Sequence, residues 1–316
     1  MFLSERMNRK SEVMRKMPGL IRHTATSLPE KPGETIVATQ LVTLITGCSS
    51  GIGAALAEEF HELGHRVYAT ARQPQSLAPL AARGIRTLVL DVTDPESIAR
   101  AVAVMSQEAG RLDLLVNNAG YALFGAVMDL SRAELQRQID TNVIAPVQVA
   151  RAFLPLMLPQ RRSRIVNVGS VSGILTTPFA GAYCASKAAL HALSDAMRME
   201  LAPFGVHVVM IQPGAVTSSL GVTGTRHVAL PADSIYAPLS KYVRGRAVAS
   251  QKSAMPTREV ARQVANAVLL ENAPAVVRRG PQSFRFPFLK RWLPVSMLDR
   301  KLRRMFGLDR PQPAAR

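Results

Sequence analysis

The stretch Thr46-Gly-Cys-Ser-Ser-Gly-Ile-Gly53 decides the fold, because it joins an apolar run at Leu41–Thr46 to an alanine-rich segment at Ala54–Leu63. A buried strand, a glycine-rich turn and a helix in direct succession are typical of a βαβ unit. Glycines allow a tight turn and let backbone N–H groups approach a pyrophosphate at the amino end of the helix, where the dipole favours negative charge. The stretch therefore predicts a dinucleotide site. A purely structural glycine turn is the alternative.

The same alternation of apolar runs and helical segments continues along the chain at the spacing of βαβ units. Strands are expected at Leu41–Thr46, Arg66–Thr70, Ile85–Leu90, Leu112–Asn117, Arg164–Val168, His207–Gln212 and Ala275–Val277. Helices are expected at Gly53–Leu63, Pro95–Glu108, Arg132–Leu158 with a kink at Pro146, Tyr183–Ala202 and Thr257–Leu270. The pattern predicts an α/β fold, a doubly wound seven-stranded parallel sheet with helices on both faces, in a single domain over residues 41–278.

Composition indicates a packed globular protein inside the cell. The chain has 316 residues, 47% of them hydrophobic and 19% charged. No run reaches the roughly 18 uninterrupted apolar residues of a membrane span, and residues 1–40 lack the apolar core of a secretory signal. Cys48 and Cys184 are the two cysteines, which indicates free thiols in a reducing, cytoplasmic compartment and no metal site.

The net charge of +17 is concentrated at the two ends of the chain. Residues 1–40 hold seven Lys/Arg and four Glu, and residues 276–316 hold eleven Lys/Arg and two Asp. Because the body between them is only mildly basic, nucleic-acid binding is disfavoured. Residues 1–40 have no sustained periodicity and are expected to form a flexible basic extension.

A second informative stretch runs from Ser170 to Lys187. Tyr183 and Lys187 are four residues apart at the start of an expected helix, so both side chains lie on one face. A free phenol has a pKa of about 10, and a nearby cation lowers it, so Tyr183 is a candidate acid and base. Ser170 follows the buried run Arg164–Val168 and is expected at the sheet edge where α/β proteins bind ligands.

The end of the second expected strand, Tyr68-Ala-Thr-Ala-Arg72, bears on the choice of cofactor. An acid at this place binds the ribose 2′-hydroxyl of NAD(H), whereas an arginine accommodates the 2′-phosphate of NADP(H). The sequence offers Arg72 and no carboxylate there, which favours NADP(H) over NAD(H). A solvated Arg72 without a role in cofactor binding is the alternative.

Together these motifs resemble the short-chain dehydrogenase/reductase family, a family with the Rossmann-type fold, over roughly residues 40–278. The matching segments are Thr46–Gly53, Asp91-Val92, Asn117-Asn-Ala-Gly120, Asn142, Ser170, Tyr183-x-x-x-Lys187 and Pro213-Gly214. Tyr-Ala-Thr-Ala-Arg72 and Tyr183-Cys-Ala-Ser-Lys-Ala-Ala-Leu look most like the members related to 17-beta-hydroxysteroid and retinol dehydrogenases. Gly169 stands where many relatives carry another serine.

The resemblance implies four catalytic residues. Tyr183 is expected as general acid and base, Lys187 as the cation beside it, Ser170 as a hydrogen-bond partner of the reacting oxygen, and Asn142 as the holder of a water that links Lys187 to solvent. A polar residue that stabilises a kink is the alternative for Asn142. Five histidines, His61, His65, His191, His207 and His227, are scattered without a partner pattern and indicate surface or helix positions.

The resemblance also implies a cofactor site, with Asp91 at the adenine, Asn118 beside the adenosine ribose and Pro213-Gly214 passing the nicotinamide. The expected cofactor-binding residues are Gly47, Ser49, Ser50, Gly51, Ile52, Gly53, Arg72, Asp91, Val92, Asn118, Ala119, Gly120, Tyr183, Lys187, Pro213, Gly214, Val216 and Thr217.

Two further segments bear on the substrate. Residues 215–256, which include Leu220 and Val222, are expected to form a lid whose apolar content favours an apolar alcohol or ketone, steroid-, retinoid- or lipid-like. Residues 279–316 mix aromatics with Lys and Arg, so they form a basic amphipathic appendage that either covers the substrate lobe or contacts an anionic membrane.

The sequence thus predicts an NADP(H)-dependent oxidoreductase that moves a hydride between the nicotinamide and an alcohol/carbonyl pair. The family resemblance implies a homo-oligomer, a dimer or tetramer. A dinucleotide-binding redox sensor or scaffold without catalysis is the alternative.

Overall fold

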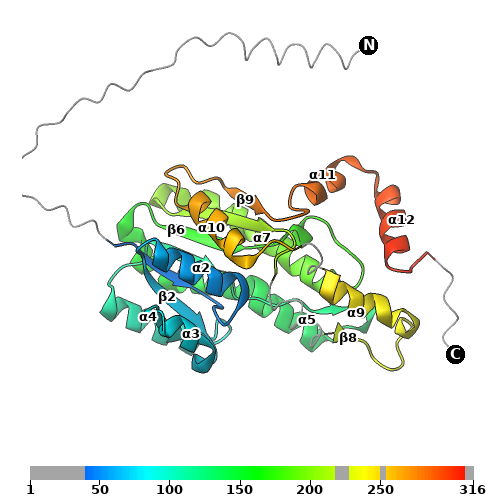
Figure 1. The fold of residues 1–316 in the computed structure, drawn as a ribbon, viewed down its shortest axis with the longest axis horizontal. Helices are drawn as coiled ribbons and strands as arrows, with labels where there is room; N and C mark the ends of the chain where they lie inside the picture. The colour runs from blue at the N-terminus through cyan, green and yellow to red at the C-terminus, as the bar shows by residue number, and fades with distance from the viewer. Residues whose placement is uncertain (1–39, 218–227, 250–253, 310–316) are drawn as a thin grey trace, which may run out of the picture. The chain divides into compact units, whose positions relative to one another are not determined.

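The computed structural model describes residues 40–217, 228–249 and 254–309, and the chain from Gln40 onward clusters into one compact unit. Its centre is a seven-stranded sheet in which every pairing is parallel (Figure 1). The expected extension at residues 1–40 lies almost entirely outside the described residues.

The strand order is β3-β2-β1-β4-β6-β7-β9, so the chain builds outward from β1 in one direction and then in the other. This reversal between β1 and β4 is the switch point at which doubly wound sheets bind ligands. The predicted seven-stranded, doubly wound parallel sheet is confirmed. The strands are β1 (Val42–Ile45), β2 (Arg66–Ala71), β3 (Arg86–Val89), β4 (Leu114–Asn117), β6 (Arg164–Val168), β7 (His207–Pro213) and β9 (Val276–Arg279).

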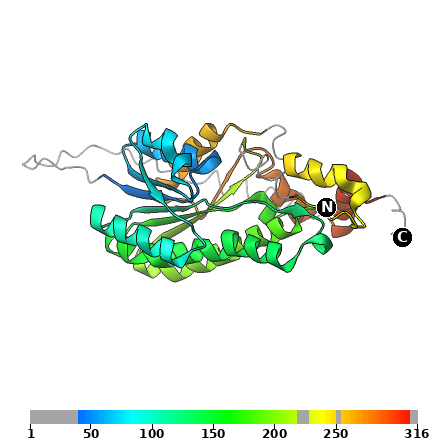
Figure 2. The ribbon, with the colours of Figure 1, turned by 90° about the horizontal axis from the view of Figure 1, so that it is seen from below.

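Helices cover both faces of the sheet, and each interface is an apolar core. Figure 2 shows α2 (Gly51–Glu62) and α10 (Thr257–Val268) on one side and α4 (Pro95–Glu108), α6 (Ala145–Met157) and α7 (Gly181–Leu201) on the other. Phe60 and Val264 belong to the first core, and Phe153 and Met105 belong to the second. All four side chains are fully or almost fully buried. A short helix, α3 (Ala78–Ala81), joins the first core.

The helix expected at Arg132–Leu158 forms as two helices with a π-helical turn between them. The segments are α5 (Arg132–Ile139), the turn η3 (Asp140–Ile144) and α6. The irregularity thus precedes Pro146, the expected kink, and proline is tolerated there because it occupies the first turn of α6. The run Arg132–Gln160 has the length and hydropathy of a membrane span, but it packs against β4, β6, α4 and α7 as a core helix does.

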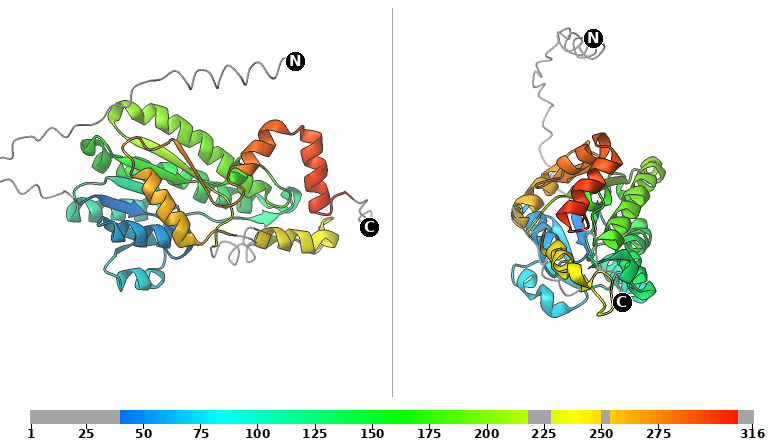
Figure 3. Two further views of the ribbon diagram at one scale, coloured as in Figure 1. Left: turned by 45° about the horizontal axis from the view of Figure 1, so that its top comes forward. Right: turned by 90° about the vertical axis from the view of Figure 1, so that its right-hand side faces the viewer.

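Smaller elements gather at the carboxyl end of the sheet. They are the parallel pair β5 (Phe124–Gly125) and β8 (Val228–Ala229), and the helices α9 (Ser240–Val248), α11 (Arg285–Trp292) and α12 (Val295–Met305). Figure 3 shows α9 in yellow and α12 in red at this end. The expected lid at 215–256 contains β8 and α9, whereas Leu220 and Val222 lie outside the described residues.

Asp113 fixes the amino ends of three central strands. Its carboxylate accepts a hydrogen bond from Val42 N at 2.8 Å and pairs with the Arg111 guanidinium at 2.5 and 3.0 Å. Its backbone N–H donates to the Val42 carbonyl oxygen, and its carbonyl oxygen accepts from the Arg164 N–H. Val42 begins β1 and Arg164 begins β6. Asp113 is buried, so its carboxylate satisfies groups that have little access to water.

We expect Asp113→Ala to lower the free energy of unfolding by about 2–3 kcal/mol, because it leaves the Val42 N–H and the Arg111 guanidinium without their acceptor. Urea unfolding followed by circular dichroism measures this. Glu271→Ala is the control, since it breaks an ion pair to Arg162 whose side chains are 75% and 79% exposed and should cost under about 0.5 kcal/mol. Equal losses in the two variants would contradict a special role for Asp113.

Candidate active site

A cavity of about 1030 Å³ opens at the carboxyl ends of the strands. One wall comes from the residues that follow β1, β2, β3, β4 and β6, and from the end of β7. The opposite wall comes from α9, α11 and α12. Most of the residues expected from the sequence line it. They are Gly47, Ser49, Ser50, Gly51, Ile52, Arg72, Asp91, Val92, Asn118, Ala119, Gly120, Ser170, Tyr183, Lys187, Pro213, Gly214 and Val216.

The glycine-rich turn forms a wall of backbone at the amino end of α2. Gly47 has φ +73°, and a Cβ there would lie 2.7 Å from the Ala119 Cα. A Cβ on Gly53 would lie 2.4 Å from the Asn118 Nδ2, so Gly53 is needed for packing behind the wall and does not line the cavity. α2 begins at Gly51, earlier than expected, so its first turn faces the cavity. The first N–H groups of a helix have no acceptor within the helix, and together with the helix dipole they make this place suitable for a pyrophosphate.

Asn118 holds this turn in place. Its Nδ2 donates to the carbonyl oxygens of Thr46 and Gly47 at 2.9 and 3.0 Å. The Thr46 hydroxyl accepts from the backbone N–H groups of Asn118 and Ala119, both at 3.0 Å. These four hydrogen bonds join the end of β4 to the end of β1, so Asn118 braces the edge of the central strands. Its expected place beside the adenosine ribose stays a prediction.

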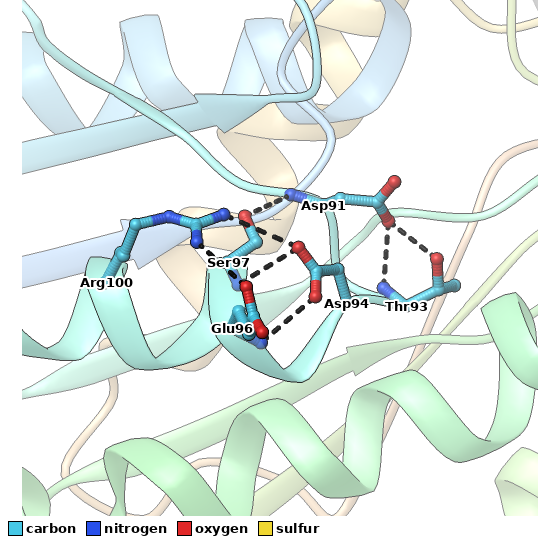
Figure 4. A network of polar contacts seen from close by, with 6 residues as sticks. All are labelled: Asp91, Thr93, Asp94, Glu96, Ser97 and Arg100. Carbon is cyan, nitrogen blue, oxygen red and sulfur yellow. Dashed lines mark hydrogen bonds and ion pairs between the residues drawn. The ribbon is translucent and has the colours of Figure 1, made fainter.

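Arg72 and Asp91 stand at the ends of the next two strands. Arg72 follows β2, is exposed, and lines the cavity. The Asp91 Oδ1 accepts from the backbone N–H and the hydroxyl of Thr93 at 2.9 and 2.7 Å, which orients the carboxylate (Figure 4). Asp94 caps α4 through the N–H groups of Glu96 and Ser97. The segment after β3 is thus a rigid turn beside the glycine loop.

Ser170 and Tyr183 line the cavity close to each other. Ser170 follows β6 and begins the short turn Val171–Gly173, and its hydroxyl is close enough to the Tyr183 phenol to oppose the rise in the pKa of that phenol. Gly173 packs on α7 at Lys187, where a Cβ would lie 2.8 Å from the backbone carbon. Both hydroxyl side chains are buried. This arrangement presents two hydroxyl groups to one point of the cavity.

Lys187 lies on the same face of α7, but the pKa of the Tyr183 phenol is raised and not lowered as expected. Its Nζ donates to the Val168 carbonyl oxygen at 2.7 Å, and burial lowers its own pKa to about 8. Burial raises the pKa of Tyr183, and the groups that oppose this rise are the Ser170 hydroxyl and Arg246. The expectation failed because it considered charge and not desolvation, which favours the neutral phenol.

Asn142 lies behind the cavity wall, within the π-helical turn. Its Nδ2 donates to the Tyr121 carbonyl oxygen and the Ser186 hydroxyl at 2.9 and 3.0 Å, and its Oδ1 accepts from the Tyr121 N–H at 3.1 Å. The side chain is fully buried. These contacts favour the alternative, a polar residue that stabilises the irregular helix. The water-holding role stays a prediction.

Pro213-Gly214 carries the chain from β7 past the cavity. Gly214 is required here, because a Cβ would lie 1.7 Å from the Pro281 carbonyl oxygen. Val216 lines the cavity, whereas Thr217 does not: it is exposed, and its N–H donates to the Met255 carbonyl oxygen at 2.9 Å. Thr217 is therefore placed beside the cofactor wall and not in it.

Sequence reasoning missed several residues at the cavity. Arg246 and Thr177 line it from α9 and from the loop before α7, and Leu298, Leu302 and Phe306 line it from the C-terminal segment. No motif marks these positions. The one available signal was the spacing of Leu298 and Leu302, which lie four residues apart on one face of α12.

His65 departs from the expected surface or helix positions, whereas the half-buried His191 lies on α7 as such a position allows. His65 is buried and bonds the Thr43 hydroxyl at 2.8 Å. His191 packs beneath Ser170, because a Cβ on Gly169 or Gly173 would lie 2.6 Å from its ring. Burial and the Lys187 charge lower the pKa of His191 to about 4, so its ring is neutral. Gly169 thus leaves room for His191, which is four residues from Lys187 on α7.

The described segments contain no cluster of side chains that could bind a metal ion. Over residues 40–217, 228–249 and 254–309, no group of three or more His, Cys, Asp or Glu side chains could hold a metal ion. Cys48 and Cys184 are free and buried.

Comparison with known proteins adds independent information. A 3-ketodihydrosphingosine reductase of Bacteroides thetaiotaomicron is 32% identical over 84% of this chain and 98% of its own. An NADPH-dependent 1-acyldihydroxyacetone phosphate reductase of Schizosaccharomyces pombe is 40% identical over 63% of this chain and 69% of its own. The crystal structure of a short-chain dehydrogenase from Streptomyces avermitilis superposes with a TM-score of 0.70 at 28% identity, covering 84% of this chain and 99% of the other.

Residues 41–227 match the short chain dehydrogenase family, a span of more than half of the chain that contains the glycine turn, Ser170, Tyr183 and Lys187. The fold, the cavity and these relatives agree with that match, and the chain belongs to the short-chain dehydrogenase/reductase family of oxidoreductases.

Proposed function

We propose that the protein is an NADP(H)-dependent oxidoreductase that interconverts an alcohol and a ketone or aldehyde on an apolar molecule. The observation that carries this proposal is the buried Ser170–Tyr183 hydroxyl pair, which faces a cavity that also contains the glycine turn and Arg72. A proton donor and a dinucleotide-sized, backbone-lined groove in one cavity are what carbonyl reduction requires.

The residues present fit a nicotinamide dinucleotide. The bare backbone at Gly47 and Gly51 suits the pyrophosphate, Asp91 and Val92 suit the adenosine, and Arg72 suits a 2′-phosphate. Lys187 and Pro213-Gly214 flank the place for the nicotinamide ribose. When bound, the cofactor supplies the hydride.

The chain's own residues supply position and a proton. In reduction, the Tyr183 hydroxyl transfers its proton to the substrate oxygen, and the Ser170 hydroxyl donates a hydrogen bond to that oxygen. Carbonyl, hydride and proton together give the alcohol, and oxidation reverses each step. Burial raises the pKa of Tyr183, so the phenol carries its proton at neutral pH.

The far wall of the cavity favours a substrate with a long apolar part. Leu289, Leu298, Leu302, Met305 and Phe306 line it from the C-terminal segment. The two relatives named above act on a ketodihydrosphingosine and an acyldihydroxyacetone phosphate, which are lipid-like ketones. We place lipid-like ketones first and steroid- or retinoid-like alcohols second.

A dinucleotide-binding sensor or scaffold without catalysis is the second candidate function. It needs the glycine turn and Asn118 but makes no use of the Ser170–Tyr183 pair. The basic composition alone is the support for nucleic-acid binding, and we rank that function third. Oligomer formation stays a prediction.

We also propose that the enzyme rests on an anionic membrane surface through α11 and α12. Phe284, Phe288 and Trp292 point outward with 67%, 62% and 69% of their surface exposed. Exposed Arg and Lys residues surround them on both helices. Aromatics flanked by cations suit the interface of an anionic bilayer, and the adjoining apolar wall would receive a lipid from it.

Tyr183→Phe removes the proton donor and keeps the ring. We expect kcat to fall by roughly 10²–10⁴-fold while NADPH binding changes by less than about twofold. Steady-state assays with lipid-like, steroid and retinoid substrates, together with NADPH titration, measure both. Tyr236→Phe, which alters a tyrosine outside the cavity, should keep full activity. Turnover retained by Tyr183→Phe would place the acid elsewhere.

Arg72→Ala tests the cofactor assignment. We expect the wild type to bind NADPH more tightly than NADH, and the variant to lose about tenfold in NADPH affinity with NADH affinity unchanged, because the guanidinium contacts the 2′-phosphate alone. Fluorescence titration with both cofactors gives the dissociation constants. Arg162→Ala, at a solvent-exposed site outside the cavity, is the matched control. Equal affinities of the wild type for the two cofactors would refute the assignment.

Phe288→Ser with Trp292→Ser tests the membrane surface. We expect sedimentation with vesicles of phosphatidylcholine and phosphatidylserine to fall at least about tenfold in affinity, because two interfacial aromatics are lost. Phe204→Ser is the control, since Phe204 is 61% exposed beside the amino end of β7. Binding that is equal for all variants, or independent of phosphatidylserine and salt, would count against this surface.

A further inference from the structure

Arg246 projects from α9 into the substrate half of the cavity. Its Nε donates to the Thr177 hydroxyl at 2.8 Å, and its guanidinium carbon lies 5.3 Å from the centre of the Phe124 ring. It lines the same cavity as Ser170 and Tyr183 and is close enough to Tyr183 for the two groups to affect each other electrostatically. The reacting oxygen of a substrate would therefore lie near this guanidinium.

Arg246 has no counter-ion in the described part of the chain. The titratable groups that influence it are Cys184 and Tyr183, and burial raises the pKa of both, so both are neutral at pH 7. The sequences of residues 218–227 and 250–253 contain no Asp or Glu, so neither segment can supply a carboxylate. Burial lowers the pKa of Arg246, because desolvation disfavours its charged form.

The acidic side chains at the cavity are occupied elsewhere. Asp91 bonds Thr93 in the adenosine half. Glu134 bonds Ser131 at the start of α5, and Asp140 accepts from the Gln136 amide at 2.7 Å. The C-terminal wall instead adds two cations, Arg285 and Lys301. Six Lys and Arg side chains line the cavity against these three carboxylates, so its lining carries a positive formal charge beside its apolar surface.

We propose that Arg246 binds an anionic oxygen group, a phosphate or a carboxylate, that the substrate carries close to its reacting carbonyl carbon. A guanidinium has a planar set of donors that matches both groups in two-point contact. The apolar side chains of α12 receive the chain on the other side of the carbonyl. This inference rests on the proposed carbonyl chemistry and narrows its substrate to anionic, lipid-like ketones, at the expense of ketones that carry an amine.

Binding to the protein loaded with NADP⁺ tests the inference without turnover. The ligands are a decanoyl ester of dihydroxyacetone phosphate, the same ester without phosphate, a long-chain β-keto acid and its methyl ester, each titrated by calorimetry. We expect at least one anionic ligand to bind about 10- to 100-fold more tightly than its neutral partner, the range for a hydrogen-bonded charge. The pair with the advantage distinguishes phosphate from carboxylate.

Arg246→Gln should abolish this advantage and leave the neutral ligands unchanged, whereas Arg246→Lys should keep part of it. Arg244→Gln, which alters an exposed arginine on the same helix, is the control and should match the wild type. Circular dichroism and NADP⁺ affinity report whether each variant is folded. If Arg246→Gln does not fold, Arg246→Lys takes its place, and an advantage as large as in the wild type would then overturn the inference.

Equal binding of charged and neutral ligands by the wild type, or an advantage that survives in Arg246→Gln, overturns the inference. Reduction of the decanoyl ester of dihydroxyacetone, which lacks the phosphate, by NADPH is followed in parallel. This reaction tests the proposed function alone. Reduction without an anionic advantage refutes the role of Arg246, and an Arg246-dependent advantage without any reduction refutes the proposed activity.

Discussion

The hydrogen bonds from the Asn118 amide to the carbonyl oxygens of Thr46 and Gly47 are the contacts on which the site depends most. They join the ends of β1 and β4, the two strands between which the chain reverses direction across the sheet. Together with the bonds that the Thr46 hydroxyl accepts from the Asn118 and Ala119 N–H groups, they hold the glycine turn against the end of β4. This close approach requires a glycine at position 53, because a Cβ there would overlap the Asn118 Nδ2.

A second close packing positions the proton-transfer half. Gly169 and Gly173 let the Ser170 turn settle onto α7 against His191 and the Lys187 backbone. The neutral His191 ring fills this space without adding a charge beneath the reacting groups. The Ser170–Tyr183 contact is thus set by backbone approach at two glycines, a more rigid determinant than side-chain rotamers would be.

The fold was predictable from local signals, and part of the site was not. Glycine spacing, β-branched runs and the i, i+4 pair Tyr183–Lys187 each act over a few residues, so they are legible in one sequence. Burial is not local. The neutral His191 ring, the raised pKa of Tyr183 and the position of Arg246 in the cavity depend on segments that the fold brings together. The bonds of Asn142 to Tyr121 likewise join two separate segments. Contacts of this kind join residues far apart in the sequence, so no fixed spacing of residues predicts them.

The electrostatics of the buried groups also reconcile a raised phenol pKa with an acid's role. Burial disfavours the phenolate before reaction, so Tyr183 holds its proton until a substrate oxygen develops negative charge. An alkoxide is a far stronger base than a phenolate, so transfer stays downhill. Arg246 acts on the phenolate that remains, because a nearby cation stabilises the charged form and so opposes the rise in the pKa of Tyr183.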